Sequence, residues 1–541
     1  SAALSWSSVA TDLDGLSDAK SAGTDFTNSL IVGHQTTGTL DGAQYNTAVG
    51  LASLDAITTG DGNTAVGYEA LSTNTTGNYN SASGIDALLS NTTGSYNTAS
   101  GTQALNSNTT ASYNTAHGYF ALFANTTGTR NLAIGKGAYD AADTENDNLA
   151  IGYDALGGAI AGGEYNVAIG NYSLDANTSG DSNVGIGYDA LTANTIGASN
   201  VALGLKSLYS NTEGDKNVSI GTKSLYTNTT GNFNVSLGYQ SLYSNQANSN
   251  TALGYMSLKD NTTGTLNVAV GRDALLYNTE GSNNTAVGYQ SLVDNTTGVR
   301  NIAIGNLAYD DADTENDNLA IGYDALGGAI AGGEYNVAIG NYSLDANTSG
   351  DNNVAVGYQA LTANTTGSYN TASGYDALTA NTTGTSNTAS GANSLVDNTT
   401  GQLNDAHGVF SLGDNTTGDY NVALGSSSLR YNTTADGNTA IGYTALREAN
   451  RTADSDGFNT AVGYNAGNTN TNDITTGNKN TLLGASTAAS DAAGTNQTVI
   501  GYGASGKDDN TVTIGNGDIT LWSAADDGEV DLGSSSVEFK D

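Results

Sequence analysis

Apolar and polar positions recur along this chain with a period of about 17 residues, as in the unit that begins at Asn63. With that Asn as position 1, position 3 is a small residue, position 4 is mostly Val, Ile or Leu, and position 5 is Gly. Position 7 is mostly polar, position 8 is Ala or Ser, position 9 is mostly Leu, and positions 12–15 mostly read Asn-Thr-Thr-Gly. A fixed period of this length is typical of a solenoid, in which each unit forms one coil.

Each coil is expected to carry one short strand at positions 1–5. Such a strand is too short to be stable alone, but stacking in parallel on its neighbours pairs its backbone groups. Small residues at position 3 and Leu at position 9 would fill the inside, Gly at positions 5 and 15 would supply unusual backbone angles, and position 7 would face solvent. Asn at positions 1 and 12 would hydrogen-bond at the corners and form ladders. The sequence predicts an all-β parallel β-roll or β-solenoid of about 29 coils.

The regularity of the repeat divides the chain into four parts. Residues 1–28 precede the repeat and are expected to form an N-terminal cap or linker. Residues 29–442 hold the regular coils, and residues 443–515 hold irregular coils with inserted loops. Residues 516–541 have strand-like alternation and are expected to start a C-terminal module, which indicates that the chain is part of a longer protein.

Composition limits the kinds of partner. With 53 acidic and 15 basic residues, the chain has a net charge of −38, which argues against binding nucleic acid or an anionic membrane. It has no Cys, so disulfides and thiolate metal sites are excluded. No apolar run reaches the roughly 18 residues of a membrane span.

Catalysis is not indicated by any set of residues. The chain has three His, and its Ser and Asp residues recur throughout the repeat, so no Ser, His and Asp combination stands out. The sequence therefore predicts a protein that is not an enzyme and has no organic cofactor.

Position 4 is polar in two runs of three successive coils. If this position faced a three-fold axis, three copies of each His would meet and could bind a metal ion or an anion through imidazole nitrogen. The alternative is that position 4 lies on an outer surface, where Ser and His are tolerated. The residues of the two runs are Ser83, Ser100 and His117, then Ser373, Ser390 and His407.

Two acidic loops, 140–147 and 310–317, carry carboxylates at alternating spacing. Ca²⁺ prefers oxygen ligands of this kind, although neither loop matches an EF-hand or a calcium-binding nonapeptide. The alternative is a solvated acidic turn. The candidate ligands are Asp143, Glu145 and Asp147 in the first loop, and Asp313, Glu315 and Asp317 in the second.

Two further residue types have more than one interpretation. Asn-Thr-Thr fits the glycosylation pattern, but these Asn residues lie at a repeated corner, and the Thr pairs could also form an ice-binding array. The 30 Tyr residues, many at position 6, either stack along the coils or bind sugars, and stacking is favoured.

The repeat core resembles two families. Asn166-Val-Ala-Ile-Gly170 and Asn301-Ile-Ala-Ile-Gly305 resemble the head repeat of trimeric autotransporter adhesins of the YadA type. Those heads are left-handed parallel β-rolls with a shorter period, packed as trimers. The longer form at 284–292, together with the flanking segments 6–19 and 532–541, resembles fibre-like structural proteins of marine tailed phages.

The resemblance implies a homotrimeric structural fibre or shaft on a tailed-phage virion, outside the cell. Its expected partners are other copies of itself, other virion proteins, and a host-surface receptor or glycan met by a terminal tip. Binding to nucleic acid and insertion into a membrane are not expected. The alternatives are the head of a trimeric adhesin on a bacterial surface and an ice-binding solenoid.

Overall fold

The computed structural model resolves the chain into two compact units, Ser1–Asn316 and Asp317–Asp541. The predicted cap and C-terminal module, including Trp6, lie almost wholly outside the described residues. The structure describes residues 19–23, 26–32, 41–158, 162–328, 332–450 and 456–519.

Both units are built from short strands, and no described residue lies in a helix. At the start of the first unit, β1 (Ala19–Gly23) pairs antiparallel with β2 (Phe26–Val32), and β2 pairs in parallel with β3 (Thr47–Val49). The following strands of that unit are β4 Thr64–Val66, β5 Ser81–Ser83, β6 Thr98–Ser100, β7 Thr115–His117, β8 Leu132–Ile134, β9 Leu149–Ile151, β10 Val167–Ile169, β11 Val184–Ile186, β12 Val201–Leu203, β13 Val218–Ile220, β14 Val235–Leu237, β15 Thr251–Leu253, β16 Val268–Val270, β17 Thr285–Val287 and β18 Ile302–Ile304.

The second unit continues the same plan. Each coil again contributes one short strand at positions 2–4, slightly shorter than the predicted span. The strands are β19 Leu319–Ile321, β20 Val337–Ile339, β21 Val354–Val356, β22 Thr371–Ser373, β23 Thr388–Ser390, β24 Asp405–His407, β25 Val422–Leu424, β26 Thr439–Ile441, β27 Thr460–Val462, β28 Thr481–Leu483, β29 Thr498–Ile500 and β30 Val512–Ile514.

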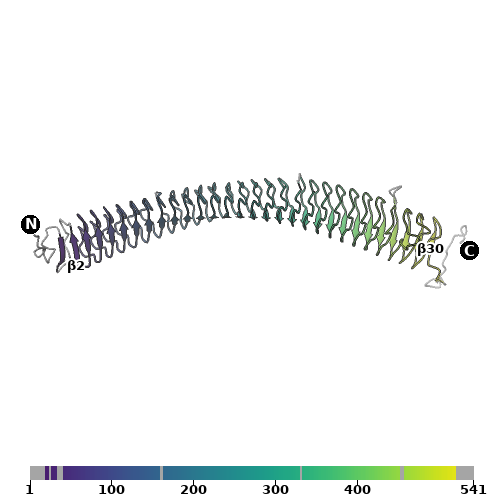
Figure 1. Ribbon diagram of the computed structural model, residues 1–541, viewed down its shortest axis with the longest axis horizontal. Helices are drawn as coiled ribbons and strands as arrows, with labels where there is room; N and C mark the ends of the chain where they lie inside the picture. The colour runs from purple at the N-terminus through teal and green to yellow at the C-terminus, as the bar shows by residue number, and fades with distance from the viewer. Residues whose placement is uncertain are drawn as a thin grey trace, which may run out of the picture. The chain divides into compact units, whose positions relative to one another are not determined.

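Successive strands within each unit pair in parallel at equal repeat positions. Between β13 and β14, for example, Val218 pairs with Val235 and Ile220 pairs with Leu237. Figure 1 shows the resulting row of strand arrows along one side of the stacked coils of each unit. The predicted all-β parallel β-solenoid, with one strand per repeat, is confirmed.

The inserted residues near the C-terminal end leave this pairing intact. Ile441 pairs with Val462, and Val462 pairs with Leu483, although these coils are longer in sequence than the regular ones. The extra residues are therefore accommodated in loops beside the ladder, as the sequence predicts for irregular coils.

The inside of each coil is narrow. Ala at position 3 and Leu at position 9 are fully buried, as predicted, in coil after coil. At two coils a buried Tyr replaces Leu, and Asn148 donates to the Tyr139 hydroxyl at 2.6 Å. Position 7 was expected to face solvent, but Asp189 and Asp273 at this position are buried, so that expectation is wrong there.

The two regularly spaced glycines of the coil have different roles. Gly357 at position 5 has φ +142°, and a Cβ built on it would lie 2.2 Å from the carbonyl oxygen of Gly374. Gly367 at position 15 has no left-handed φ, but its Cβ would lie 2.3 Å from the carbonyl oxygen of Gly384. The prediction of an unusual backbone angle is correct for position 5 and wrong for position 15, where close approach of the next coil requires Gly.

Three other positions per coil adopt left-handed backbone angles without being Gly. In one coil these are position 7 (Gln359, φ 55°), position 9 (Leu361, φ 55°) and position 17 (Tyr369, φ 61°). Such angles cost about 1 kcal/mol or more for a residue with a Cβ. They persist because backbone hydrogen bonds to neighbouring coils fix the path, for example from the Tyr369 nitrogen to the Asp351 oxygen at 3.0 Å.

Replacing a non-glycine residue at position 17 by Gly should therefore stabilise the coil. Ser386 has φ 59° and its backbone nitrogen donates to the oxygen of Ser368, a bond that Gly keeps. For Ser386→Gly we expect a gain of about 0.5–1 kcal/mol in the free energy of unfolding, measured by chemical denaturation.

Ser349 provides the matched control, because it is exposed and lacks a positive φ. Ser349→Gly should lose about 0.5–1 kcal/mol, since Gly there only adds freedom to the unfolded chain. Equal losses for the two substitutions would contradict the strain argument.

Two buried Asn ladders run along the coils, as predicted. At position 1, the backbone nitrogen of Asn370 donates to Asn353 Oδ1 at 3.0 Å. At position 12, Asn364 Nδ2 donates to Asn347 Oδ1 and to the carbonyl oxygen of Gly367, both at 2.9 Å. Because these bonds repeat from coil to coil, the corners are held by side chains as well as by the strands.

Candidate functional site

One side of the strand ladder is open to solvent. Because side chains alternate along a strand, position 3 points inward while positions 2 and 4 point outward. Positions 17 and 6 continue this spacing of two on either side. We call these four columns of outward side chains the strand face. At position 4, Leu203 is 44% exposed and Leu237 is 41% exposed, so the apolar column lies outside the coil.

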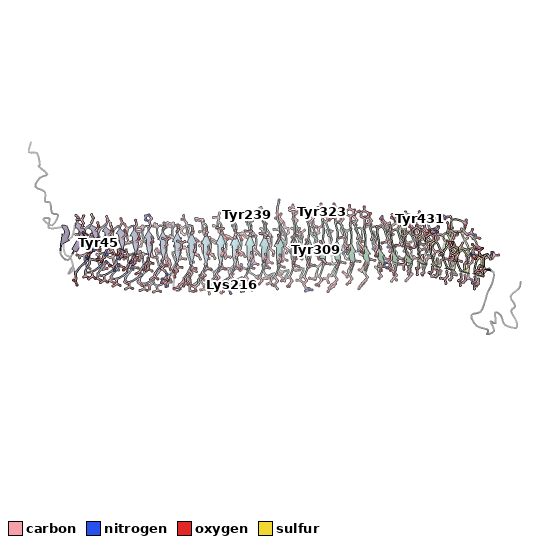
Figure 2. All side chains as sticks on the ribbon, turned by 90° about the horizontal axis from the view of Figure 1, so that it is seen from below. Tyr45, Lys216, Tyr239, Tyr309, Tyr323 and Tyr431 are labelled. Atoms are coloured by element: carbon pink, nitrogen blue, oxygen red, sulfur yellow. The ribbon has the colours of Figure 1, made fainter. Side chains whose placement is uncertain are left out.

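The strand face is mostly apolar. Soluble monomers rarely expose a continuous apolar patch larger than a few hundred Å². In Figure 2, Tyr239 from position 6 and Lys216 from position 17 lie toward opposite margins of the coils, while the buried Tyr309 lies between the margins. Exposed apolar residues of this face between β8 and β18 are Ile134, Leu203, Leu205, Phe233, Val235, Leu237, Tyr239, Leu253, Tyr255, Leu266, Val268, Tyr289, Ile302 and Ile304.

The charge of the strand face differs from that of the whole chain, which has 53 acidic and 15 basic residues. Among the described residues, the carboxylates of this face are Asp147, Asp317 and Asp405. Its basic side chains are Arg130, Lys136, Lys216, Arg272, Arg300 and Lys479. The net negative charge of the chain is therefore carried by the other sides of the coils.

Aromatic residues on the strand face stack from coil to coil. The rings of Tyr79, Tyr96 and Tyr113 at position 17 have centroid separations of 5.2 and 5.1 Å. Tyr239 and Tyr255 at position 6 are stacked at 5.4 Å. The predicted stacking is confirmed, and it turns the ring faces of these residues toward one another.

The two His residues of the position 4 column lie on the strand face, in separate units. His117 is exposed. His407 Nε2 lies 2.9 Å from Asp405 Oδ1, whereas the equivalent neighbour of His117 is Thr115. A metal ion or anion shared between copies at these residues stays a prediction, because it depends on how copies meet.

The first acidic loop does not bring its three carboxylates together. Glu145 is 4% exposed, and its Oε2 accepts hydrogen bonds from the backbone nitrogens of Asp143 and Thr144, both at 3.1 Å. Its Oε1 accepts from the backbone nitrogen of Gly162 at 3.0 Å. Glu145 thus closes the turn by accepting from backbone groups.

The other two carboxylates of this loop have their own partners. Asp143 accepts from the hydroxyl of Thr126, and Asp147 Oδ1 lies 2.6 Å from Arg130 Nε. The Arg130 guanidinium lowers the pKa of Asp147 below its ordinary value. Within the described ranges, no group of three or more His, Cys, Asp or Glu residues is placed to hold a metal ion.

The second acidic loop repeats this arrangement in part. Glu315 Oε2 accepts from the backbone nitrogens of Asp313 at 3.0 Å and Thr314 at 3.1 Å, and Asp317 is the first residue of the second unit. Calcium binding at either loop stays a prediction, which metal analysis of the purified chain would test.

A row of partly buried Asp residues follows position 10 and position 7. Burial raises the pKa of Asp175, and the charges of Asp154 and Asp189 raise it further. Asp345 occupies the same place in the second unit, where burial and the charge of Asp324 raise its pKa. A raised folded-state pKa stabilises the folded chain below the ordinary value of 3.8, and this stabilisation is lost as pH rises through the folded value.

The free energy of unfolding should therefore fall as pH rises from about 4 to 7. Asp175→Asn should raise the midpoint of thermal unfolding at pH 7 and flatten its dependence on pH, and Asp345→Asn should behave alike. Asp508→Asn, at an exposed site, controls for the loss of one negative charge. If Asp508→Asn has the same effect as Asp175→Asn, overall charge rather than burial is responsible.

The Asn-Thr-Thr corners use their polar atoms internally. The Thr365 hydroxyl at position 13 donates to the Thr382 oxygen at 3.0 Å, which leaves the position 14 hydroxyls as the outward ones. The ice-binding interpretation stays a prediction. The Asn residues that fit the glycosylation pattern are fully buried and donate through Nδ2 to the ladder, so they carry no sugar in the folded chain; examples are Asn74, Asn91, Asn125 and Asn228.

Comparisons with known proteins do not assign this chain. No family model matches it, and no curated protein matches it. Among the described residues, no helix is long and apolar enough to cross a membrane.

Proposed function

We propose that this chain is a non-enzymatic shaft segment of a tailed-phage fibre, built from three copies. The observation that carries this proposal is the uninterrupted parallel ladder of each unit combined with an open strand face. The ladder gives each coil two neighbours fixed by backbone bonds, and the strand face offers a continuous surface for other copies. The sequence resemblance to phage fibre repeats supports the virion as its location.

The ladder suits a mechanical role. Each coil is joined to the next by strand hydrogen bonds and by side-chain bonds at two corners, for example Asn370 to Asn353 and Asn364 to Asn347. A load on one coil is therefore shared by many short bonds to the next. Such a shaft would hold a terminal tip away from the particle and toward a receptor or glycan on a host surface.

The trimeric state is supported by the resemblance and by the balance of surfaces. A coil this narrow buries one Leu and small residues, and leaves its Val, Ile and Leu side chains at positions 2 and 4 outside. Packing these columns against other copies would remove them from water, at about 25 cal/mol per Å² of apolar area. The face is also the side with the fewest carboxylates, so copies meet there with the least repulsion.

Two measurements test the proposal. The mass of the purified chain in sedimentation equilibrium should be three times that of one chain. Gold-labelled antibody against the repeat should mark fibres on virus particles in electron micrographs of the source culture. Label on bacterial envelopes would favour the adhesin alternative, and a monomer that alters ice growth would favour the ice-binding alternative.

A further inference from the structure

The strand face carries one polar patch in each unit. The first patch has Ser83, Ser100 and His117 at position 4, and the second has Ser373, Ser390 and His407. Every other described residue at position 4 is Val, Ile or Leu, from Val49 to Ile514. The neighbouring side chains at position 2 are also polar: Ser81, Thr98 and Thr115 in the first patch, and Thr371, Thr388 and Asp405 in the second.

The apolar part of the strand face cannot define how two copies align along the coils. Successive coils are spaced by roughly 4.8 Å and present the same kinds of side chain. A shift of one copy by one coil therefore buries almost the same apolar area. Patterns of this kind leave the alignment weakly specified unless some position distinguishes the correct one.

The area available is large enough for association. Four columns at the spacing of a strand are roughly 20 Å wide, so each coil offers roughly 100 Å². The coils from β8 to β18 then exceed the roughly 800 Å² per partner of a standard interface. Because many registers offer this area, apolar burial drives association without selecting one of them.

The polar patches do distinguish registers. In a shifted register, the Ser hydroxyls and the His imidazole of a patch would face Val, Ile or Leu of another copy. Each polar group buried without a partner costs about 1–3 kcal/mol. When copies are aligned, each patch meets the same patch, where hydroxyls and imidazoles can hydrogen-bond across the interface or keep water. In the second patch, the pair between His407 and Asp405 at 2.9 Å stays beside its own kind.

We propose that these two polar patches set the axial register in which copies of this chain pack through their strand faces. The inference rests on the proposed self-association. The partner is a further copy of the same chain, parallel and unshifted, so that equal coils lie side by side.

Disulfide cross-linking tests the register directly, because the chain has no Cys of its own. Leu203 and Leu237 are both exposed at position 4, and they lie two coils apart. The chains Leu203→Cys and Leu237→Cys, mixed and oxidised, should form 203–203 and 237–237 disulfides but few 203–237 disulfides. Two coils correspond to about 9.6 Å, beyond the Cα separation of roughly 4.4–6.8 Å that a disulfide requires.

The same Cys variants are then made in a chain without patches, carrying Ser83→Val, Ser100→Val, His117→Ile, Ser373→Val, Ser390→Val and His407→Ile. We expect the share of 203–237 disulfides to rise at least several-fold. Thr76→Val, Thr93→Val and Thr127→Val serve as a control, since these exposed side chains at position 14 lie off the strand face. The control chain should keep the register of the unmodified chain.

Two results would overturn the inference, and they differ in meaning. If the chain without patches still forms only 203–203 and 237–237 disulfides, the patches do not set the register, while self-association stands. If the unmodified chains form no disulfides and sediment as monomers, the strand face does not join copies, and the trimeric part of the proposed function fails as well.

Discussion

Gly357→Ala is expected to disrupt the second unit more than any other single change considered for the coil interior. The new Cβ would lie 2.2 Å from the carbonyl oxygen and 2.7 Å from the carbonyl carbon of Gly374, and φ is +142°. The clash is with backbone of the next coil, so no side-chain rotation relieves it. We expect a loss of at least about 4 kcal/mol in the free energy of unfolding, the size that marks a severe structural conflict.

Hydrogen exchange and chemical denaturation measure this effect. Exchange should become faster in β21 and β22, the strands on either side of the substitution. Gly413→Ala is the matched control, since its Cβ meets nothing nearer than 3.5 Å and its φ is ordinary. That variant should be stabilised by about 0.4–1 kcal/mol, because Ala restricts the unfolded chain. Similar stabilities for the two variants would refute the close-approach argument.

Asn364→Ala should produce the second largest loss. Asn364 Nδ2 donates to Asn347 Oδ1 and to the Gly367 oxygen, and its Oδ1 accepts from Asn381 Nδ2 at 2.9 Å. The substitution leaves Asn347 Oδ1 buried without this donor. With a cost of about 1–3 kcal/mol for each buried group left unpaired, we expect a loss of about 3–5 kcal/mol.

Asn364→Asp sharpens the test. At pH 7 its second carboxylate oxygen would face two acceptors where Asn presents a donor, so the loss should exceed that of Asn364→Ala. Lowering the pH should recover part of the stability, because a protonated Asp can donate one hydrogen bond. Thr366→Ala, close by in the same corner and exposed, should change stability by less than about 0.5 kcal/mol. Denaturation midpoints of the three variants at pH 7 and pH 4 decide between these outcomes.

The coil plan could be predicted from the sequence because one set of local interactions repeats. Ala at position 3, Leu at position 9, Gly at position 5 and the Asn residues at positions 1 and 12 each satisfy the same need in each coil. The left-handed angles at Gln359, Leu361 and Tyr369 could not be predicted, since nothing in those residue types favours them. They follow from the path that the whole stack imposes.

The strand face could be predicted only in part. Position 4 is apolar, and large apolar residues are usually expected inside. The coil interior is too narrow for them, because position 3 admits only small residues there. The alternation through positions 17, 2, 4 and 6, as in Phe233, Val235, Leu237 and Tyr239, was the available signal for an outward face.

The acidic loops show a different limit. Alternating carboxylates suggested shared ligands, but the direction of each side chain depends on the turn. Glu145 turns inward to accept backbone donors, and Asp147 turns toward Arg130 of the preceding coil. Spacing along the sequence did not contain these directions.

The buried position 12 ladder also bears on how the chain is made. An oligosaccharide is attached to Asn-Xaa-Thr while a chain is still unfolded, and it occupies the same Nδ2 that Asn74, Asn91 and Asn228 later donate within the coil. A chain glycosylated at these corners could not close its coils. Synthesis in a compartment without that modification, such as the bacterial cytoplasm, leaves every corner free to fold, whereas passage through a eukaryotic secretory pathway would modify the protein at the atoms that hold it together.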